Sequence, residues 1–266
     1  MGIQSDAMSI PSTQTAIVAV EAGGPEVLQF RTDYPVPVPD EGQVLVKNML
    51  SGVNFIDIYF RTGLYPSTKP EVLGREAAGT IVSLGPNTEE QGLKVGDRVI
   101  WLGNLSYAEY TAAPAAKTVK IPDGVSDEAA VASFMSGLTV LALAEEAYPV
   151  KSGDWVLLHA AAGGAGWLMT QILKTLGAKV IGTAGGPEKV ALVKSLGAEH
   201  VIDYLSDEGK NWPKIVKEIT NGRGVDAVYD SVGADTWEGS LDAVKRKGTI
   251  VWFGNSSGPI PSLPLK

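Results

Sequence analysis

The spacing of apolar residues divides the chain into two parts. Between Thr15 and Pro122, short alternating or β-branched runs recur about every eight to twelve positions, with Gly, Pro and Asn between them. We expect a helix at residues 55–62 and strands at residues 16–20, 27–31, 43–51, 78–84 and 98–101. This pattern predicts a compact, mostly antiparallel β domain that forms a partly open barrel.

From Asp127 the apolar period becomes helical, and helices then alternate with strands. A long helix is expected at 128–148, closed by Pro149. Strands are expected at 155–161, 179–183, 200–203, 227–231 and 249–254, with helices at 166–176, 187–196, 212–220 and 237–245. The alternation predicts βαβ units around a doubly wound parallel sheet. A six-stranded sheet of this kind needs one more strand, so the chain looks truncated at its C-terminus.

The first crossover of this second part carries the clearest motif. The apolar run that starts at Trp155 leads directly into Ala161-x-Gly163-x-x-Gly166, a variant of G-x-G-x-x-G with Ala in the first position. In such a turn the second small residue lets the backbone approach a pyrophosphate, and the third lets the helix pack closely on its strand. A second buried strand follows at the spacing where a ribose-binding residue is expected. The motif predicts a dinucleotide site with phosphates at a helix N-terminus.

Composition narrows the classes of function. The 266 residues are 44% hydrophobic and 20% charged, as in a globular protein with a sizeable core, and no run of about 18 uninterrupted apolar residues suggests a membrane span. The net charge of −8, without a long basic run, argues against RNA as a main partner. The absence of cysteine fits a reducing compartment. Residues 1–14 carry no signal or transit features, so we expect a flexible tail on a cytoplasmic protein.

The residue types in the chain indicate whether a catalytic metal is expected and which nicotinamide cofactor is favoured. With no cysteine and only two histidines, both in or beside predicted strands, no catalytic zinc is expected. After the second strand, Thr183-Ala184-Gly185-Gly186 contains no acid of the kind that binds the ribose 2′-hydroxyl of NAD. This gap favours NADPH, with Lys189 as a counter-charge for the 2′-phosphate. Alternatively, Lys189 is an exposed helix residue.

Polar side chains also gather in the first part. Asn54 and Asp57 are three positions apart and share one side of the predicted helix, with Tyr59 and Tyr65 close by in sequence. They are candidates to line a catalytic pocket. The alternative is that Asn54 caps the helix and the tyrosines are half-buried.

Seven sequence blocks, taken in order, resemble the medium-chain dehydrogenase/reductase superfamily, and within it the zinc-free quinone oxidoreductases of the zeta-crystallin type. The blocks are Gly52-Val53-Asn54-Phe55-Ile56-Asp57, Leu73-Gly74-Arg75-Glu76-Ala77-Ala78-Gly79, Val95-Gly96-Asp97-Arg98-Val99, Tyr107-Ala108-Glu109-Tyr110, Phe134-Met135-Ser136-Gly137-Leu138-Thr139, residues 160–166, and Leu196-Gly197-Ala198-x-x-Val201-Ile202-x-Tyr204. Asn54 and Arg75 stand where zinc-dependent relatives have metal ligands. The resemblance implies a GroES-like catalytic domain at 15–132, a Rossmann domain at 133–266, and an active site in the cleft.

The resemblance also implies roles for individual residues. Asn54, Asp57, Tyr59 and Tyr65 match the substrate-pocket cluster. The positions that match NADPH-binding ones are Ala162, Gly163, Gly164 and Ala165 at the pyrophosphate, Gly185, Lys189 and Tyr204 at the 2′-phosphate and adenine, Met135 and Thr139 near the nicotinamide, and Phe253, Gly254, Asn255 and Ser256 over its far face.

By resemblance, the protein passes electrons from NADPH to quinones without a metal. Two alternatives are an NADPH-dependent reductase of alkenals or enones, and a non-catalytic NADPH-binding protein. Members of the family complete the catalytic domain with a C-terminal return and commonly pair as homodimers through an edge strand, so a homodimer is expected if that segment is present. Without it, apolar surface would be exposed.

Overall fold

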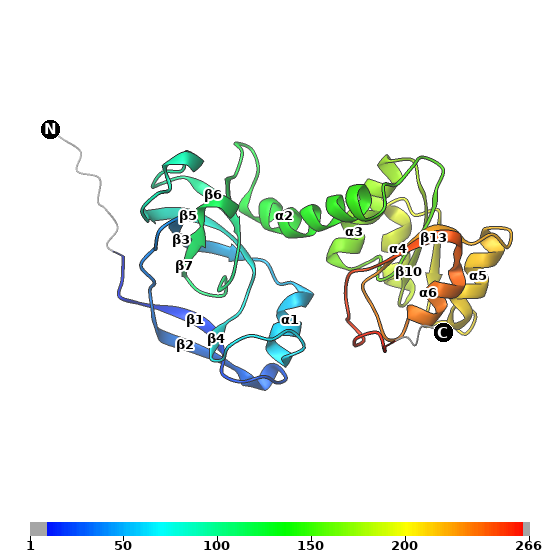
Figure 1. Ribbon diagram of the computed structural model, residues 1–266, viewed down its shortest axis with the longest axis horizontal. Coiled ribbons are helices and arrows are strands. Elements are labelled where there is room, and N and C mark those ends of the chain that lie inside the picture. Colours follow the sequence, from blue (N-terminus) through cyan, green and yellow to red (C-terminus); the bar gives the residue numbers. More distant parts are fainter. Residues whose placement is uncertain (1–9, 263–266) are drawn as a thin grey trace. The chain divides into compact units, whose positions relative to one another are not determined.

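Figure 1 shows the computed structural model, which describes residues 10–262. The chain divides into two compact units, Met1–Met135 and Ser136–Lys266, each with its own sheet and hydrophobic core.

The first unit is the antiparallel β domain that the sequence predicts. One sheet has the order β7-β3-β5-β6-β8 and a smaller one the order β2-β1-β4. Val44 and Val46 of β3, Ile81 of β5 and Trp101 of β6 meet in one buried cluster. The elements are β1 (Thr13–Ala19), η1 (Pro25–Val27), β2 (Leu28–Pro35), β3 (Gln43–Ser51), α1 (Phe55–Thr62), β4 (Glu71–Val72), β5 (Glu76–Leu84), η2 (Glu89–Gln91), β6 (Arg98–Leu102), β7 (Tyr110–Pro114), η3 (Ala115–Lys117) and β8 (Thr118–Lys120).

Some local predictions for this unit were wrong. The strand expected at 27–31 starts one residue later, because Val27 lies in a 3-10 turn whose N–H bonds to the Gly24 carbonyl. The sequence analysis also missed β4, β7 and β8, which have two, five and three residues. Strands this short give a weak alternation signal, and they form because neighbouring strands supply their hydrogen bonds.

The second unit is the predicted doubly wound domain. Its parallel sheet has the order β11-β10-β9-β12-β13, so the chain starts in the middle and winds outward in both directions. The elements are α2 (Asp127–Ala142), which begins in the first unit, the π-helical turn η4 (Leu143–Ala147), β9 (Trp155–Leu158), α3 (Gly164–Thr175), β10 (Lys179–Ala184), α4 (Pro187–Ser195), β11 (His200–Asp203), η5 (Gly209–Asn211), α5 (Trp212–Ile219), β12 (Val225–Asp230), α6 (Trp237–Ala243) and β13 (Val244–Trp252).

Both faces of this sheet are covered. Val156 and Leu158 of β9 pack into a cluster with Met169 of α3, and Leu157, between them in sequence, packs into a second cluster with Val216 of α5. Because successive strand residues point to opposite faces, a strand covered on both sides is continuously apolar rather than alternating.

Several element boundaries in this unit differ from the prediction. β9 ends at Leu158 rather than 161, and α3 starts at Gly164 rather than 166. Residues 244 and 245, expected at the end of a helix, begin β13, which pairs with β12 from Val244 onward through an irregular register. The helix expected at 128–148 ends earlier, because Tyr148 precedes Pro149 and adopts an extended conformation.

The helical segment Asp127–Ala147 has 21 residues and a mean hydropathy of 1.3, so by length and composition alone it could cross a membrane. Residues near both ends of this segment belong to hydrophobic clusters of the two units. Ala130 packs with Ile100 and Ile121 in the first unit, and Val140 and Leu143 belong to the core of the second. Only 22% of its most apolar stretch is buried, so packing within the units covers just part of its apolar surface.

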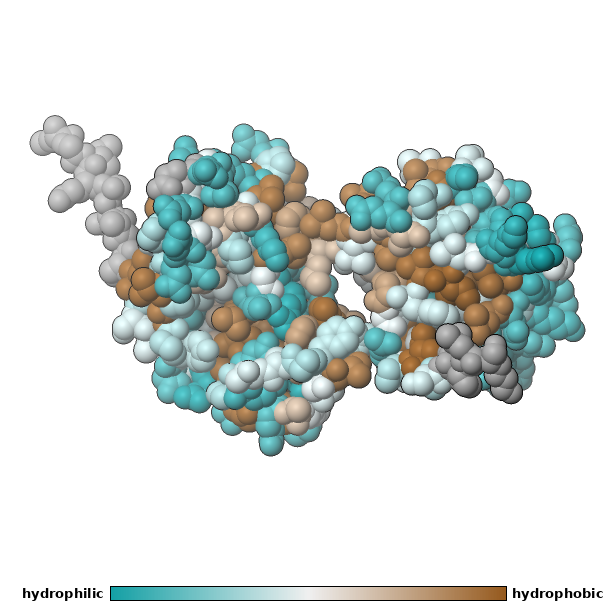
Figure 2. All heavy atoms as spheres, viewed as in Figure 1, coloured by the Kyte–Doolittle hydropathy of each residue, from teal (hydrophilic) through white to brown (hydrophobic). Residues whose placement is uncertain are grey.

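Figure 2 shows apolar side chains at the surface of both units, among hydrophilic ones. In the first unit, exposed apolar residues line a shallow groove of about 680 Å³ beside β1 and β3. The exposed apolar residues that line it are Phe30, Met49, Leu50 and Val53.

We predict that Gly79→Ala destabilises the first unit by about 1–3 kcal/mol. A Cβ at this position of β5 would overlap the backbone carbonyl oxygen of Lys47 on β3, and backbone atoms within a sheet cannot move aside cheaply. The matched control is Gly137→Ala in α2, where a Cβ meets nothing within 4 Å and the helix should gain up to about 1 kcal/mol. Urea unfolding of the two variants measures both effects, and equal stabilities would contradict the prediction.

Candidate functional site

The turn between β9 and α3 has the geometry that its small residues predict. Ala160 has a positive φ of 50°, and the N–H of Ala161 bonds to the Thr183 carbonyl of β10 at 3.0 Å. A Cβ on Gly166 would overlap the Ala160 carbonyl oxygen and lie 2.8 Å from the Ala161 Cα, so only glycine lets α3 approach its strand this closely. The packing role predicted for Gly166 is confirmed.

The first turn of α3 leaves backbone donors available. Gly163 is the N-cap residue and offers no side chain to the free N–H groups. A helix N-terminus with free N–H groups and a favourable dipole suits an anion. Gly163, Gly164 and Ala165, predicted at the pyrophosphate, lie at this start of α3, and Ala162 directly precedes them.

A cavity of about 400 Å³ opens at the carboxyl ends of β9, β10 and β12. This edge is where ligands bind in open α/β sheets. The cavity is lined by His159, Ala160, Thr183, Tyr204, Lys210, Trp212, Val232, Asp235, Thr236 and Ser256.

Only two sequence-predicted residues, Tyr204 and Ser256, are among those lining the cavity. Gly185 lies beneath Tyr204, since a Cβ on it would be 2.7 Å from the tyrosine hydroxyl. Lys189 is exposed on α4. The other predicted cofactor residues lie outside this lining: Met135 and Thr139 in α2, and Phe253, Gly254 and Asn255 after β13.

Sequence reasoning missed most of the lining. It did not place His159 at the site, and the structure shows a histidine that is 2% exposed and lines the cavity. Thr183, Val232 and Thr236 could have been found from their positions at or just after strand ends. Trp212 had no such signal, because it reaches the cavity from the start of α5.

Hydrogen bonds hold the His159 ring on both sides. Nδ1 lies 3.1 Å from Thr183 Oγ1, and Nε2 lies 3.2 Å from Ser240 Oγ. The ring packs edge-on against Trp212 at 4.7 Å between centroids. Burial lowers the pKa of His159 to about 4, although the charge of Asp230 acts in the opposite direction. The imidazole is therefore neutral at physiological pH.

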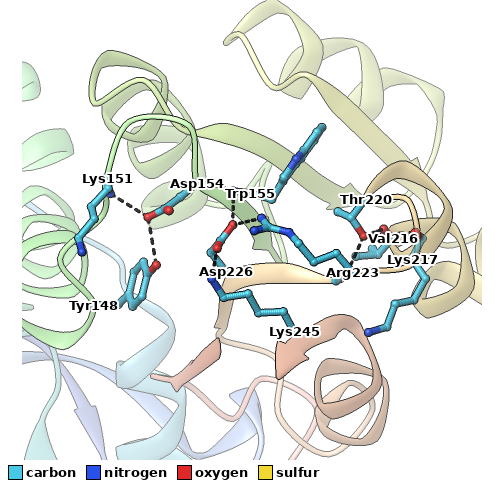
Figure 3. A network of polar contacts seen from close by, with 11 residues as sticks. Tyr148, Lys151, Asp154, Trp155, Val216, Lys217, Thr220, Arg223, Asp226 and Lys245 are labelled. Carbon is cyan, nitrogen blue, oxygen red and sulfur yellow. Dashed lines mark hydrogen bonds and ion pairs between the residues drawn. The ribbon is translucent and has the colours of Figure 1, made fainter. Parts of the chain in front are cut away.

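A different buried network holds the opposite edge of the same sheet (Figure 3). Asp226 at the start of β12 accepts a 2.8 Å bond from the backbone N–H of Trp155 on β9, and pairs with Arg223 at 2.5 Å and with Lys245. Burial acts to raise the pKa of Asp226, but the hydrogen bonds from Lys245 and Trp155 and the charge of Arg223 hold it below its ordinary value. This network joins three strands and is structural.

The first unit brings the predicted polar residues together around the start of α1. Asp57 Oδ2 accepts bonds from the Asn54 backbone N–H at 2.9 Å and from the Tyr107 hydroxyl at 2.7 Å. The Asn54 side-chain amide donates to Glu76 at 2.8 Å, and Glu76 also accepts the Met135 N–H at 3.0 Å. Burial raises the pKa values of both carboxyl groups, against the opposing effect of these hydrogen bonds. Sequence reasoning missed Glu76 as a member of this cluster.

The two tyrosines form the other half of this cluster. The rings of Tyr59 and Tyr65 lie 5.1 Å apart, and the Tyr65 N–H bonds to the Tyr59 carbonyl at 3.0 Å. Tyr59 is 7% exposed, whereas Tyr65 is half-buried. Asp57 therefore supports the helix start, and Asn54 and Tyr65 are the members with side chains least enclosed by the fold.

Arg75, which stands near this cluster, contacts three neighbouring side chains. Its guanidinium lies 3.6 Å from the centroid of the Phe60 ring, pairs with Glu71 at 3.3 Å, and bonds to Asn104. Among residues 10–262, no group of three or more His, Cys, Asp or Glu side chains is arranged to hold a metal ion.

Comparison with known proteins agrees with this architecture. Residues 40–123 match the family described as alcohol dehydrogenase GroES-like domain, and residues 164–266 match the one described as zinc-binding dehydrogenase. A quinone oxidoreductase of Salmonella typhimurium is 44% identical over 246 residues, which are 91% of this chain and 73% of the relative. A 2-haloacrylate reductase of Burkholderia sp is 38% identical over 253 residues, covering 91% of this chain and 74% of the relative.

Among solved structures, Escherichia coli quinone oxidoreductase complexed with NADPH superposes with a TM-score of 0.89 at 42% identity, covering 94% of this chain and 76% of that one. The fold and the crossover define a two-domain, dinucleotide-binding oxidoreductase. The chain belongs to the quinone oxidoreductase family of the medium-chain dehydrogenase/reductase superfamily.

We predict that His159 stays neutral from about pH 8 to about pH 5 in the folded protein. The unfolded chain binds a proton on this ring near pH 6.5 and the folded chain only near pH 4, so the contribution of His159 to stability falls as the pH decreases through that window. Nitrogen chemical shifts of the imidazole, followed by NMR across this range, measure the titration directly. A midpoint above about pH 6 would contradict the assigned burial effect.

Proposed function

We infer that this protein is an NADPH-dependent quinone reductase that works without a metal ion. The observation that carries the inference is 44% identity to quinone oxidoreductases across both domains, joined to a nucleotide cavity whose second strand ends without an acidic residue. Residues 183–186 at that strand end carry no acidic side chain of the kind that binds the ribose 2′-hydroxyl of NAD.

The residues present fit such a cofactor. A Cβ on Gly166 would overlap the turn before α3, and one on Gly185 would push against the Tyr204 hydroxyl, so glycine at these positions lets α3 and Tyr204 lie close to the ends of β9 and β10. We propose that the N–H groups at the start of α3 hold the pyrophosphate and that Tyr204 and Lys189 meet the adenosine 2′-phosphate. Bound NADPH supplies the two electrons as a hydride.

On the substrate side, we propose that Asn54 and Tyr65 orient the quinone while Asp57 and Tyr59 hold them in place. The 2.8 Å bond from the Asn54 amide nitrogen to buried Glu76, together with the capping box at the start of α1, holds the Asn54 side chain in one orientation. A tyrosine hydroxyl can donate to a quinone oxygen as negative charge develops on it.

A second activity has specific support. The relative that is 38% identical is named a 2-haloacrylate reductase, so a polarised double bond is a plausible alternative acceptor for the same hydride. The third possibility, a protein that binds NADPH without turnover, is separated from both by the assay below.

A cytoplasmic location and a homodimeric assembly also belong to this proposal, and light scattering of the purified protein would test the assembly. The net charge of −8 supports the expectation that RNA is not a main partner.

We predict that the protein binds NADPH in preference to NADH and oxidises it when 1,2-naphthoquinone is added, and that a chelator leaves the rate unchanged. Tryptophan fluorescence measures binding, and absorbance at the nicotinamide band measures turnover. Tyr65→Phe should lower kcat/KM for the quinone about tenfold and leave the Kd for NADPH unchanged, because this residue lies in the other unit. Faster turnover of 2-chloroacrylate would favour the second activity, and binding without turnover would overturn both.

We predict that Lys189→Ala raises the Kd for NADPH about tenfold and leaves the Kd for NADH unchanged, because only NADPH carries the 2′-phosphate. Lys194→Ala is the matched control, since Lys194 is an exposed lysine at the other end of the same helix. Equal effects of the two substitutions, or equal effects on both cofactors, would remove Lys189 from the site.

A further inference from the structure

The second strand of the nucleotide-binding sheet ends in a neutral residue that is connected to a buried charge. Thr183, 3% exposed, lines the cavity at the end of β10. From its hydroxyl, hydrogen bonds run through His159 and Ser240 to Asp230 at the end of β12, with lengths of 3.1, 3.2 and 2.8 Å. All four side chains are at most 3% exposed.

The direction of these hydrogen bonds is fixed at the Asp230 end. Asp230 Oδ1 accepts the backbone N–H groups of Val232 at 2.8 Å and Gly233 at 3.1 Å, and the Thr236 hydroxyl at 2.9 Å. Backbone N–H groups can only donate, so this carboxylate is held as an acceptor. The single proton of Ser240 is then directed to Oδ2 at 2.8 Å.

Each further step has only one solution. Since Ser240 donates to Asp230, it must accept from His159, which therefore carries its proton on Nε2. A neutral ring protonated on Nε2 has a lone pair on Nδ1, and Thr183 donates its hydroxyl proton to it. Because its proton is directed to His159, Thr183 Oγ1 can only accept a hydrogen bond from a group in the cavity.

We propose that Thr183 is the hydrogen-bond acceptor for a ribose hydroxyl of the adenosine half of the cofactor, and that Asp230, Ser240 and His159 are positioning residues that set its polarity. The inference rests on the proposed function. When the 2′-position carries a phosphate, the remaining hydroxyl of that ribose is the 3′-hydroxyl, which is the group assigned to Thr183.

The arrangement explains how this strand end can serve a phosphorylated cofactor. A carboxylate at the same place would accept a ribose hydroxyl but repel a 2′-phosphate. Here the acceptor is neutral, and the charge that orients it lies three hydrogen bonds away and is compensated by its own donors. The protein can therefore accept a hydrogen bond from the ribose hydroxyl at Thr183 without placing a negative charge there to repel the 2′-phosphate.

The first test reads the protonated nitrogen of His159 from long-range proton–nitrogen correlation spectra. The chain has two histidines, so His200 is an internal reference. The wild type should carry the proton on Nε2. In Asp230→Asn, the N–H groups of Val232 and Gly233 require the amide oxygen, which turns the amide nitrogen toward Ser240, reverses the hydrogen bonds and moves the His159 proton to Nδ1. A wild-type proton on Nδ1, or an unchanged proton position in a folded Asp230→Asn variant, would overturn the proposal.

The second test uses calorimetry with 2′,5′-ADP and its 3′-deoxy analogue, and it does not depend on the Asp230 variant folding. The wild type should bind the analogue about tenfold more weakly. Thr183→Val should bind both compounds with equal, weakened affinity, and Thr183→Ser, which keeps the hydroxyl, should retain the tenfold difference. A Thr183→Val protein that still discriminates would overturn this inference and leave the proposed function intact. Failure of the wild type to bind either 2′,5′-ADP or NADPH would overturn both.

Discussion

The close approach of α3 to the end of β9 is the constraint on which the nucleotide domain depends. Gly166 has no Cβ, so the helix can start directly on the turn, and the N–H of Ala161 can still reach the Thr183 carbonyl at 3.0 Å. That bond joins the ends of β9 and β10, and the helix start then faces the same edge. A larger residue at position 166 would separate the helix from the strand and remove the geometry at which phosphate and ribose can be held together.

β12 shows how the two edges of one sheet can be given different electrostatic characters. Asp226 at its start is neutralised by two cations, Arg223 and Lys245. Asp230 at its end is held by neutral donors only, from the backbone and from hydroxyl groups. Asp226 is buried while its two cations are partly exposed, so removing them would leave a buried charge uncompensated, which is costly. Neutral donors leave the cavity edge with an oriented dipole and no bound cation.

The sequence predicts those parts of the structure that rest on local pattern. The change from short β runs to alternating helices and strands, the doubly wound sheet and the role of Gly166 all follow from spacing and residue size. The short strands β4, β7 and β8 do not, because their hydrogen bonds come from neighbours far away in the chain. The cavity lining was largely missed for the same reason. Ser240 is 81 residues from His159, and only the order of the strands brings them together.

The polar cluster around α1 was easier to predict as a cluster, since Asn54, Asp57, Tyr59 and Tyr65 lie within twelve positions of sequence on and around one helix. The sequence did not indicate Glu76, whose carboxylate accepts a hydrogen bond from the Asn54 side-chain amide. Arg75, its neighbour, lies where zinc-dependent relatives have a metal ligand, and its guanidinium is occupied by Phe60, Glu71 and Asn104. A cation held in this way stabilises the loop and cannot be exchanged for a metal ion without rebuilding its partners. The side chains gathered at the start of α1 are held in a comparable way, by hydrogen bonds from Asn54 to Glu76 and from Tyr107 to Asp57.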